Sequence, residues 1–148
     1  YIGTTTLDFE RSSIGNAVGQ RQTLEYYMKF WKENQGTAAT GSASTKAKDE
    51  FADRWIEAAV AKMLSYRVVS MQVSGKIPNY EASMCKMFSS ELSQRIANLS
   101  MHLYGMYGNV KNRSSMGYMQ AVSSTIAGGT TEIQKGIIAT RGLGLPRG

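Results

Sequence analysis

The 148-residue chain contains a single cysteine, two prolines and one histidine. One cysteine excludes an internal disulfide framework and fits a reducing compartment, so we expect a cytoplasmic protein. We expect Cys85 itself to be a small core residue. One cysteine and one histidine are also too few for a zinc site unless carboxylates cluster around them, and we expect no bound metal. The sequence has no run of about eighteen apolar residues, which excludes a membrane-spanning helix.

The chain is basic, with a net charge of +6. This charge suits an anionic partner such as a phosphate-bearing cofactor, a CoA ester or a nucleic acid. The basic residues are spread out, however, and no basic stripe is interleaved with aromatic residues. A basic helical module that binds DNA or RNA is therefore a remote alternative, and we expect no nucleic-acid partner.

The length fits one domain, and the scarcity of proline with frequent Ala, Met, Gln, Lys and Leu favours helix. Apolar periodicity predicts helices over 7–32, over 47–72 and from Pro78 to Gly105. Residues 109–129 are either irregular or contain a short helix around 115–122, and a last helix follows over 131–140. The small polar residues of 33–46 predict a loop. No period-two pattern is long enough to compete, so we predict an all-α, up-down four-helix bundle.

Each long helix has an apolar stripe that predicts its buried face. The first stripe consists of Leu7, Ile14, Val18, Leu24, Met28 and Trp31. The second consists of Ala52, Ile56, Ala59, Met63, Tyr66 and Val69. The third consists of Met84, Met87, Phe88, Leu92, Ile96, Leu99 and Leu103.

The most distinctive segment is Ile-Ala-Gly-Gly-Thr-Thr-Glu-Ile-Gln-Lys at 126–135, followed by Arg-Gly-Leu-Gly-Leu-Pro-Arg at 141–147. Gly128 and Gly129 let the backbone approach another group closely. Thr130 then offers a helix N-cap, and Glu132 lies where a first-turn carboxylate is favoured. A helix start after glycines can bind an anion, but an ordinary capped helix after a glycine turn has the same pattern.

This segment, with Ile-Ile-Ala at 137–139, closely resembles the C-terminal signature of the acyl-CoA dehydrogenase flavoenzymes. Leu-Asp-Phe-Glu-Arg at 7–11 resembles the start of that family's C-terminal helical domain. The resemblance covers nearly the whole chain, and it is loose between residues 20 and 46. It implies that residues 1–148 are one C-terminal helical-bundle domain of a longer flavoenzyme, and the absence of a methionine before Tyr1 agrees with this expectation.

The resemblance implies FAD as cofactor and α,β-dehydrogenation of an acyl-CoA thioester. In that reaction a carboxylate removes the α-proton, the β-hydrogen leaves as hydride to the flavin, and donors polarise the thioester carbonyl. An N-terminal helical domain and a middle β domain would supply most of the site. The implied partners are an electron-transfer flavoprotein or similar acceptor and further subunits, in a homo-oligomer (dimer or tetramer) or a mixed tetramer with a related subunit.

The resemblance also implies where the catalytic base lies. Many members have it immediately before the Gly-Thr of the signature, where this chain has Gly128. The isovaleryl-CoA and long-chain enzymes instead have it on the first helix of this domain, at the position of Glu10. We therefore predict Glu10 as the base. Taken alone, Glu10 would be a first-turn carboxylate favoured by the helix dipole.

Further roles follow from the resemblance. The backbone N–H of Gly128 would face the thioester oxygen, and Arg11 and Gly129 would lie beside the substrate. The residues implied at the flavin are Thr130, Glu132, His102 and Gly105. Simpler alternatives stay open: Arg11 as a solvated arginine, Thr130 and Glu132 as capping residues, and His102 as a cap or buried core histidine.

The chain departs from the family pattern in three places. Residues 32–36 read Lys-Glu-Asn-Gln-Gly where the family commonly has Arg-x-x-Phe-Gly, a contact to the flavin pyrophosphate across a subunit interface. His102 and Met106 replace a glutamine and a glycine, and Met119-Gln120 replaces an Arg-Asp pair. A second hypothesis is therefore a non-catalytic or half-site structural subunit of a mixed acyl-CoA dehydrogenase assembly.

Overall fold

The computed structural model describes residues 14–34 and 44–147, and the secondary structure there is helical. The helices are α2 (Ile14–Glu33), α3 (Ser44–Val73), α4 (Tyr80–Tyr104), α5 (Arg113–Ser124) and α6 (Thr131–Ile137). A short 3-10 helix, η1 (Gly105–Asn109), follows α4, and a π-helical turn, η2 (Ile138–Gly142), continues α6. The all-α prediction is confirmed. None of the helices in the described ranges is long and apolar enough to span a membrane.

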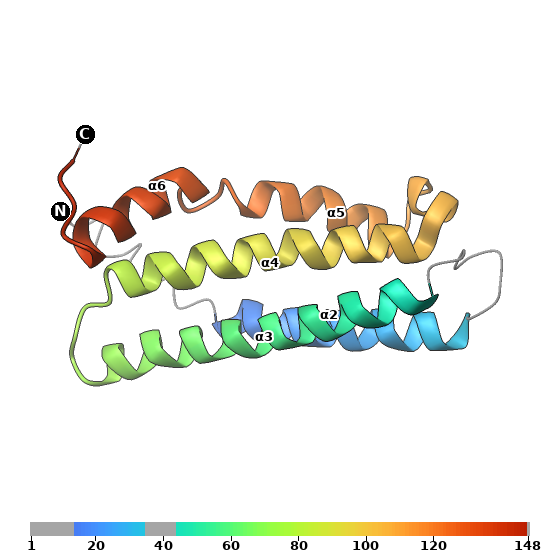
Figure 1. The fold of residues 1–148 in the computed structure, drawn as a ribbon, viewed down its shortest axis with the longest axis horizontal. Coiled ribbons are helices and arrows are strands. Elements are labelled where there is room, and N and C mark those ends of the chain that lie inside the picture. Colours follow the sequence, from blue (N-terminus) through green and yellow to red (C-terminus); the bar gives the residue numbers. More distant parts are fainter. Residues whose placement is uncertain (1–13, 35–43, 148) are drawn as a thin grey trace.

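The helix α4 lies in the middle of the molecule (Figure 1). The helices α2 and α3 pack on one side of it, while α5 and α6 follow one another along the other side (Figure 1). The fourth position of the predicted bundle is thus filled by two short helices in tandem rather than by one. The link between them, which contains the Gly-Gly-Thr segment, consequently lies against α4.

Small side chains explain how α4 is covered on several faces. Its buried residues include Ala82, Ser83, Cys85, Ser89, Ser90, Ala97 and Ser100. Such residues let neighbouring helices approach closely, so that close packing reaches most of the helix surface. Cys85 is fully buried with its Sγ atom 3.4 Å from Ser65 Oγ, which confirms it as a small core residue.

The third apolar stripe predicts the core well. Leu92, Ile96, Leu99 and Leu103 of α4 are buried and pack with Leu24, Tyr27 and Trp31 of α2. Met84, at the start of that stripe, is 37% exposed, so the prediction is wrong at this residue.

In the first stripe Leu24 and Trp31 are buried as predicted, whereas Val18 is 53% exposed. The buried position of that turn belongs to Ala17, which is smaller.

The predicted buried face of α3 is wrong. Ile56, Met63 and Tyr66 are exposed, at 63%, 67% and 49%, and Ala52 and Ala59 are exposed with them. The face that packs into the core instead consists of Phe51, Ala58, Ala61, Ser65 and Val68. Both faces of this helix are largely apolar, and periodicity alone does not distinguish them. The face with the smaller side chains packs inward because it allows a closer helix–helix approach.

The helix ends follow local rules. Pro78 lies just before α4 rather than in its first turn, and Asn79 occupies the N-cap position. Gly105, with φ +52°, ends α4 as predicted. Asn112 and Ser115 form a reciprocal capping box at the start of α5, which confirms a short helix there. Residues 7–13 of the first predicted helix, and most of the predicted loop over 33–46, lie outside the described residues.

Candidate functional site

The site is built around the turn that joins α5 to α6. Gly128 and Gly129 have φ values of +70° and +102°. Side chains other than glycine adopt such conformations at a cost, so this turn requires both glycines. The Gly129 N–H donates to the Ile126 carbonyl oxygen at 3.2 Å, which closes the turn.

Thr130 is the N-cap of the seven-residue helix α6, and its side chain accepts a hydrogen bond from the Ile133 N–H at 3.4 Å. Glu132 follows in the first turn. Its own backbone N–H and then the Thr130 hydroxyl bond to the carboxylate and lower the pKa of Glu132 from its ordinary value of 4.5. The capping roles of Thr130 and Glu132 are therefore confirmed, while their roles at a flavin stay predictions.

A buried lysine on α4 contacts the same turn. Lys86 is only 8% exposed, and its ammonium group donates to the Gly129 carbonyl oxygen at 2.6 Å and to the Thr125 carbonyl oxygen at 3.3 Å. A charged donor makes such hydrogen bonds short and strong. The central helix thus fixes both ends of the turn.

Two glutamine side chains complete this inner network. Gln134 of α6 is fully buried, and its Nε2 lies 3.1 Å from the Gly128 carbonyl oxygen and 3.4 Å from that of Gly129. Gln94 of α4 donates to Thr125 Oγ1 at 3.1 Å. The carbonyl groups of Gly128 and Gly129 therefore point toward the bundle interior, and the turn has a defined orientation.

The sequence patterns did not single out this network. A signal was available for Lys86, which stands among small buried residues of the third helix, Ala82, Ser83, Cys85 and Ser89. A lysine on the buried side of a helix is rarely left without a partner. No comparable signal points to Gln94 or Gln134.

The tail after α6 returns to the start of α4. Arg141 Nη1 donates to Asn79 Oδ1 at 2.9 Å, which connects the signature tail to the N-cap of α4. A Cβ atom at Gly142 would lie 3.1 Å from the ring of Tyr80, so the glycine permits this close approach. Both ends of the signature are therefore attached to the first half of α4.

The predicted flavin contacts His102 and Gly105 lie at the other end of α4. His102 follows Lys86 by sixteen positions, or about 24 Å along the helix axis. Its side chain is 68% exposed, with Nδ1 3.9 Å from Glu50 Oε2, so the alternative of a buried core histidine is wrong. Within one chain, His102 and Gly105 are not brought together with the turn at 126–130.

Glu10 and Arg11 lie outside the described residues, as does the Leu-Asp-Phe-Glu-Arg segment that contains them. The helix into which that segment leads, α2, is described from Ile14 onward. Among the residues that the structure describes, no group of three or more His, Cys, Asp or Glu side chains could hold a metal ion.

Comparison with known proteins agrees with the geometry. Residues 1–143 match the family described as "Acyl-CoA dehydrogenase, C-terminal domain". The chain belongs to the acyl-CoA dehydrogenase family. The acyl-CoA dehydrogenase FadE34 of Mycobacterium tuberculosis is 26% identical over 146 residues, which are 99% of this chain and 20% of that protein.

Two further similarities agree with this family and its fold. The caffeyl-CoA reductase-Etf complex subunit CarC of Acetobacterium woodii is 27% identical over 137 residues, 90% of this chain and 36% of that protein. The structure of a glutaryl-coenzyme A dehydrogenase with glutaryl-CoA superposes with a TM-score of 0.82 at 23% identity, over 98% of this chain and 38% of that one, which confirms the acyl-CoA dehydrogenase C-terminal fold. The chain thus spans between a fifth and two fifths of the length of these proteins.

Proposed function

We propose that this chain is the C-terminal domain of an FAD-dependent acyl-CoA dehydrogenase that introduces a double bond between the α and β carbons of an acyl-CoA thioester. The observation that supports this most is the Gly-Gly-Thr turn, which occurs at the signature position and is fixed from inside by Lys86 and Gln134. Because the chain spans at most two fifths of these relatives, the other domains must supply the rest of the site, and the isolated domain should be inactive.

Two groups of this chain act on the thioester in the proposal. Glu10 takes the α-proton, and the Gly128 N–H donates to the thioester oxygen as negative charge develops there. The Gly128 and Gly129 carbonyl groups accept hydrogen bonds from the interior, which keeps their oxygen atoms away from a developing oxyanion. Arg11 and Gly129 contact the substrate beside these two groups.

The residues present fit part of an FAD site. Gly128 is exposed among the residues that the structure describes, so a planar group can approach the turn from outside. Thr130 has an oriented hydroxyl there, with Glu132 beside it. When bound, FAD would accept the hydride from the β-carbon. This chain would hold one edge of the flavin, while the missing domains and a second subunit hold the remainder.

Assembly follows from the same proposal. His102 and Gly105 lie too far from the turn of their own chain to share one flavin edge with it, so we place them at the flavin of a neighbouring subunit. The exposed apolar face of α3, with Ile56, Met63 and Tyr66, offers a surface for such a neighbour. CarC is named as a subunit of an Etf complex, and we likewise propose an electron-transfer flavoprotein or similar acceptor as a partner here.

A second candidate is the half-site subunit of a mixed tetramer. Lys32, at the end of α2, stands where relatives have an arginine that contacts the flavin pyrophosphate, and Met119-Gln120 replaces an Arg-Asp pair on α5. In that arrangement a related subunit provides the complete flavin contacts, and this chain provides the scaffold.

The test uses the full-length protein and its Glu10→Gln variant under anaerobic conditions. Wild-type protein should lose the oxidised flavin absorbance when an acyl-CoA ester is added, and Glu10→Gln should bind the ester without flavin reduction. Asp8→Asn, which removes a carboxylate two residues away, is the matched control and should still reduce the flavin. Full activity in Glu10→Gln would place the base elsewhere.

A further inference from the structure

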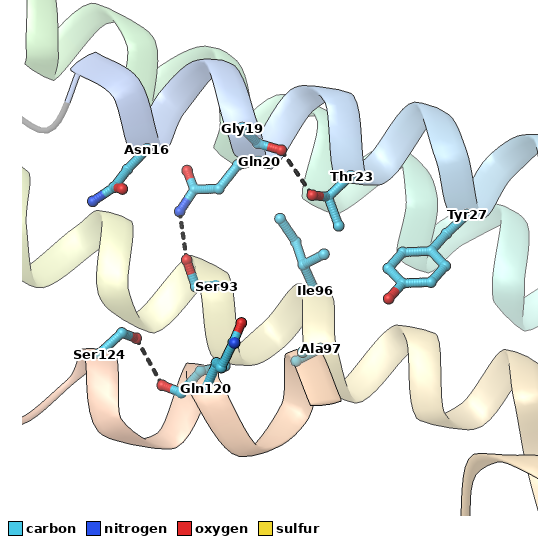
Figure 2. A pocket seen from close by; sticks show the side chains of 12 residues that line it. Asn16, Gly19, Gln20, Thr23, Tyr27, Ser93, Ile96, Ala97, Gln120 and Ser124 are labelled. Carbon is cyan, nitrogen blue, oxygen red and sulfur yellow. Dashed lines mark hydrogen bonds between the residues drawn. The ribbon is translucent and has the colours of Figure 1, made fainter. Parts of the chain in front are cut away.

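A groove between α2 and α5, with α4 as its floor, has no role in the reaction described above (Figure 2). Its volume is about 330 Å³. The floor includes Ile96 and Ala97, and Gly19 and Gly117 widen the two walls. The remaining lining residues used below are Asn16, Gln20, Thr23, Ser93, Gln120 and Ser124.

The polar side chains of the lining are all uncharged. The lining consists of amide and hydroxyl side chains around an apolar floor, with no Asp, Glu, Lys, Arg or His among the twelve residues. A neutral group with an apolar body and a hydrogen-bonding substituent fits such a surface. A carboxylate would lose water there without gaining a cationic partner from the described residues of the lining, which is costly.

The hydrogen bonds of the lining show which atoms remain for a ligand. Gln20 Nε2 is committed to the Ser89 carbonyl oxygen at 2.6 Å and to Ser93 Oγ at 2.8 Å. The hydroxyl groups of Thr23 and Ser124 donate to carbonyl oxygens of their own helices at 2.8 Å and 2.7 Å. Their oxygen atoms keep lone pairs that can accept a hydrogen bond.

The rim adds two more amide groups. Asn16 lies on α2 and Gln120 on α5, on opposite sides of the groove (Figure 2). Both side chains are exposed, and each amide offers two donor hydrogens and an acceptor oxygen. The groove is thus suited to a substituent such as a hydroxyl group, which both donates and accepts.

The position of the groove relates it to the proposed reaction. Ser124 ends α5 and precedes Gly128 by four residues, so the α5 wall leads directly into the signature turn. The α2 wall begins at Asn16, six residues after Glu10 in the sequence. From Gly117 to Ser124 the α5 wall is about 10 Å long, enough for several methylene groups of an extended chain.

We propose that this groove binds the far end of the acyl group and selects uncharged acyl groups with a hydrogen-bonding substituent over acyl groups that end in a carboxylate. This inference rests on the proposed acyl-CoA dehydrogenase function and names its substrate class. The thioester lies at Gly128, and the acyl group extends along α5 toward Gly117.

Gly117 provides a direct test. Among the described residues, a Cβ atom there would meet only the Tyr27 hydroxyl oxygen, at 3.9 Å, so a larger side chain fits the backbone and would fill the groove. Gly136 of α6 is the matched control, because it is also a helical glycine and a Cβ atom there meets no atom of the described residues within 4 Å. Gly136 lies outside the groove lining.

The experiment measures kcat/KM and, by calorimetry, the Kd of the full-length protein for four CoA esters: butyryl, octanoyl, ω-hydroxyoctanoyl and the half-ester of octanedioic acid. For the wild-type protein, kcat/KM with the ω-hydroxyoctanoyl ester should exceed kcat/KM with the dicarboxylic ester by more than about 100-fold. Gly117→Leu should lower the ratio of kcat/KM for octanoyl-CoA to kcat/KM for butyryl-CoA by about tenfold or more, while Gly136→Leu leaves this ratio unchanged. Gln120→Leu, a change at the exposed rim, should remove the preference for ω-hydroxyoctanoyl over octanoyl, and it provides the test if Gly117→Leu does not fold.

Two results would overturn the inference, and they differ in meaning. If wild type dehydrogenates acyl-CoA esters but Gly117→Leu and Gln120→Leu leave every ratio unchanged, the groove is not the acyl site and the proposed function stands. If wild type neither binds nor dehydrogenates any of the four esters, the proposed function fails and the inference fails with it.

Discussion

The Nζ atom of Lys86 lies 2.6 Å from the carbonyl oxygen of Gly129, forty-three residues later in the chain. This hydrogen bond joins the central helix to the turn that identifies the family. Lys86 is nearly buried, so its hydrogen bonds to the Thr125 and Gly129 carbonyl groups are made away from most of the solvent. The orientation of the signature turn is therefore determined in part by a residue outside the signature.

Lys86→Met should destabilise the protein. The change leaves the carbonyl groups of Thr125 and Gly129 without their charged donor, which we expect to cost about 1–3 kcal/mol in the free energy of unfolding. Chemical denaturation of wild type and variant measures this difference. Lys111→Met, at an exposed lysine, should change stability by less than about 0.5 kcal/mol. Equal effects of the two substitutions would mean that the buried hydrogen bonds contribute little.

Gly128→Ala should also destabilise, for a reason of backbone conformation. The added Cβ atom has room, but φ is +70°, and the left-handed region costs a non-glycine residue about 1–2 kcal/mol. Gly136→Ala, inside helix α6, should instead stabilise by up to about 1 kcal/mol because alanine favours helix. Thermal unfolding of the two variants should shift in opposite directions, and a shift in the same direction would contradict the described turn.

Ile56→Lys should weaken assembly of the full-length protein. Ile56 is 63% exposed on the apolar face of α3, so a charge there costs little in the monomer but would be desolvated in an interface. Sedimentation velocity should show a shift toward smaller species. Val73→Lys, at the exposed end of the same helix, is the matched control and should leave the distribution unchanged. A wild-type protein that sediments as a monomer would refute the assembly proposal.

Glu132 should contribute a pH-dependent part of the stability. Its pKa is lowered in the folded state, so ionised Glu132 stabilises the fold above its unfolded pKa near 4.5, and this stabilisation is lost as the pH falls through the lower folded value. The stability difference between wild type and Glu132→Gln should therefore be larger at about pH 7 than at about pH 3. Denaturation curves at both pH values measure it, and a difference independent of pH would contradict the prediction.

Most of the fold could be predicted from the chain because apolar spacing and glycine positions are local properties. The stripe from Leu92 to Leu103 identified the core face of α4, and Gly105 marked the end of that helix. The face of α3 could not be predicted in this way. Its two apolar faces have the same period, and the smaller residues around Ala58 and Ala61 pack inward.

The candidate site was predicted in part for a similar reason. The Gly-Gly-Thr signature is contiguous in sequence, so its turn and cap were visible before the fold was known. The partners of the turn, Lys86 and Gln134, come together only through tertiary packing of α4 against α6. His102 is exposed because its neighbours Leu103 and Tyr104 take the positions that pack on the bundle, while the His102 side chain lies at the surface beside Glu50 of α3.

The most direct test of the account is the visible absorbance spectrum of the purified full-length protein, with bound flavin counted per chain. The account predicts about one FAD per chain and loss of the oxidised flavin absorbance on addition of an acyl-CoA ester. Half occupancy beside a co-purifying related subunit would favour the mixed assembly with this chain as its half-site member. A protein that binds no flavin would contradict the proposed dehydrogenase and would leave the signature turn a structural element.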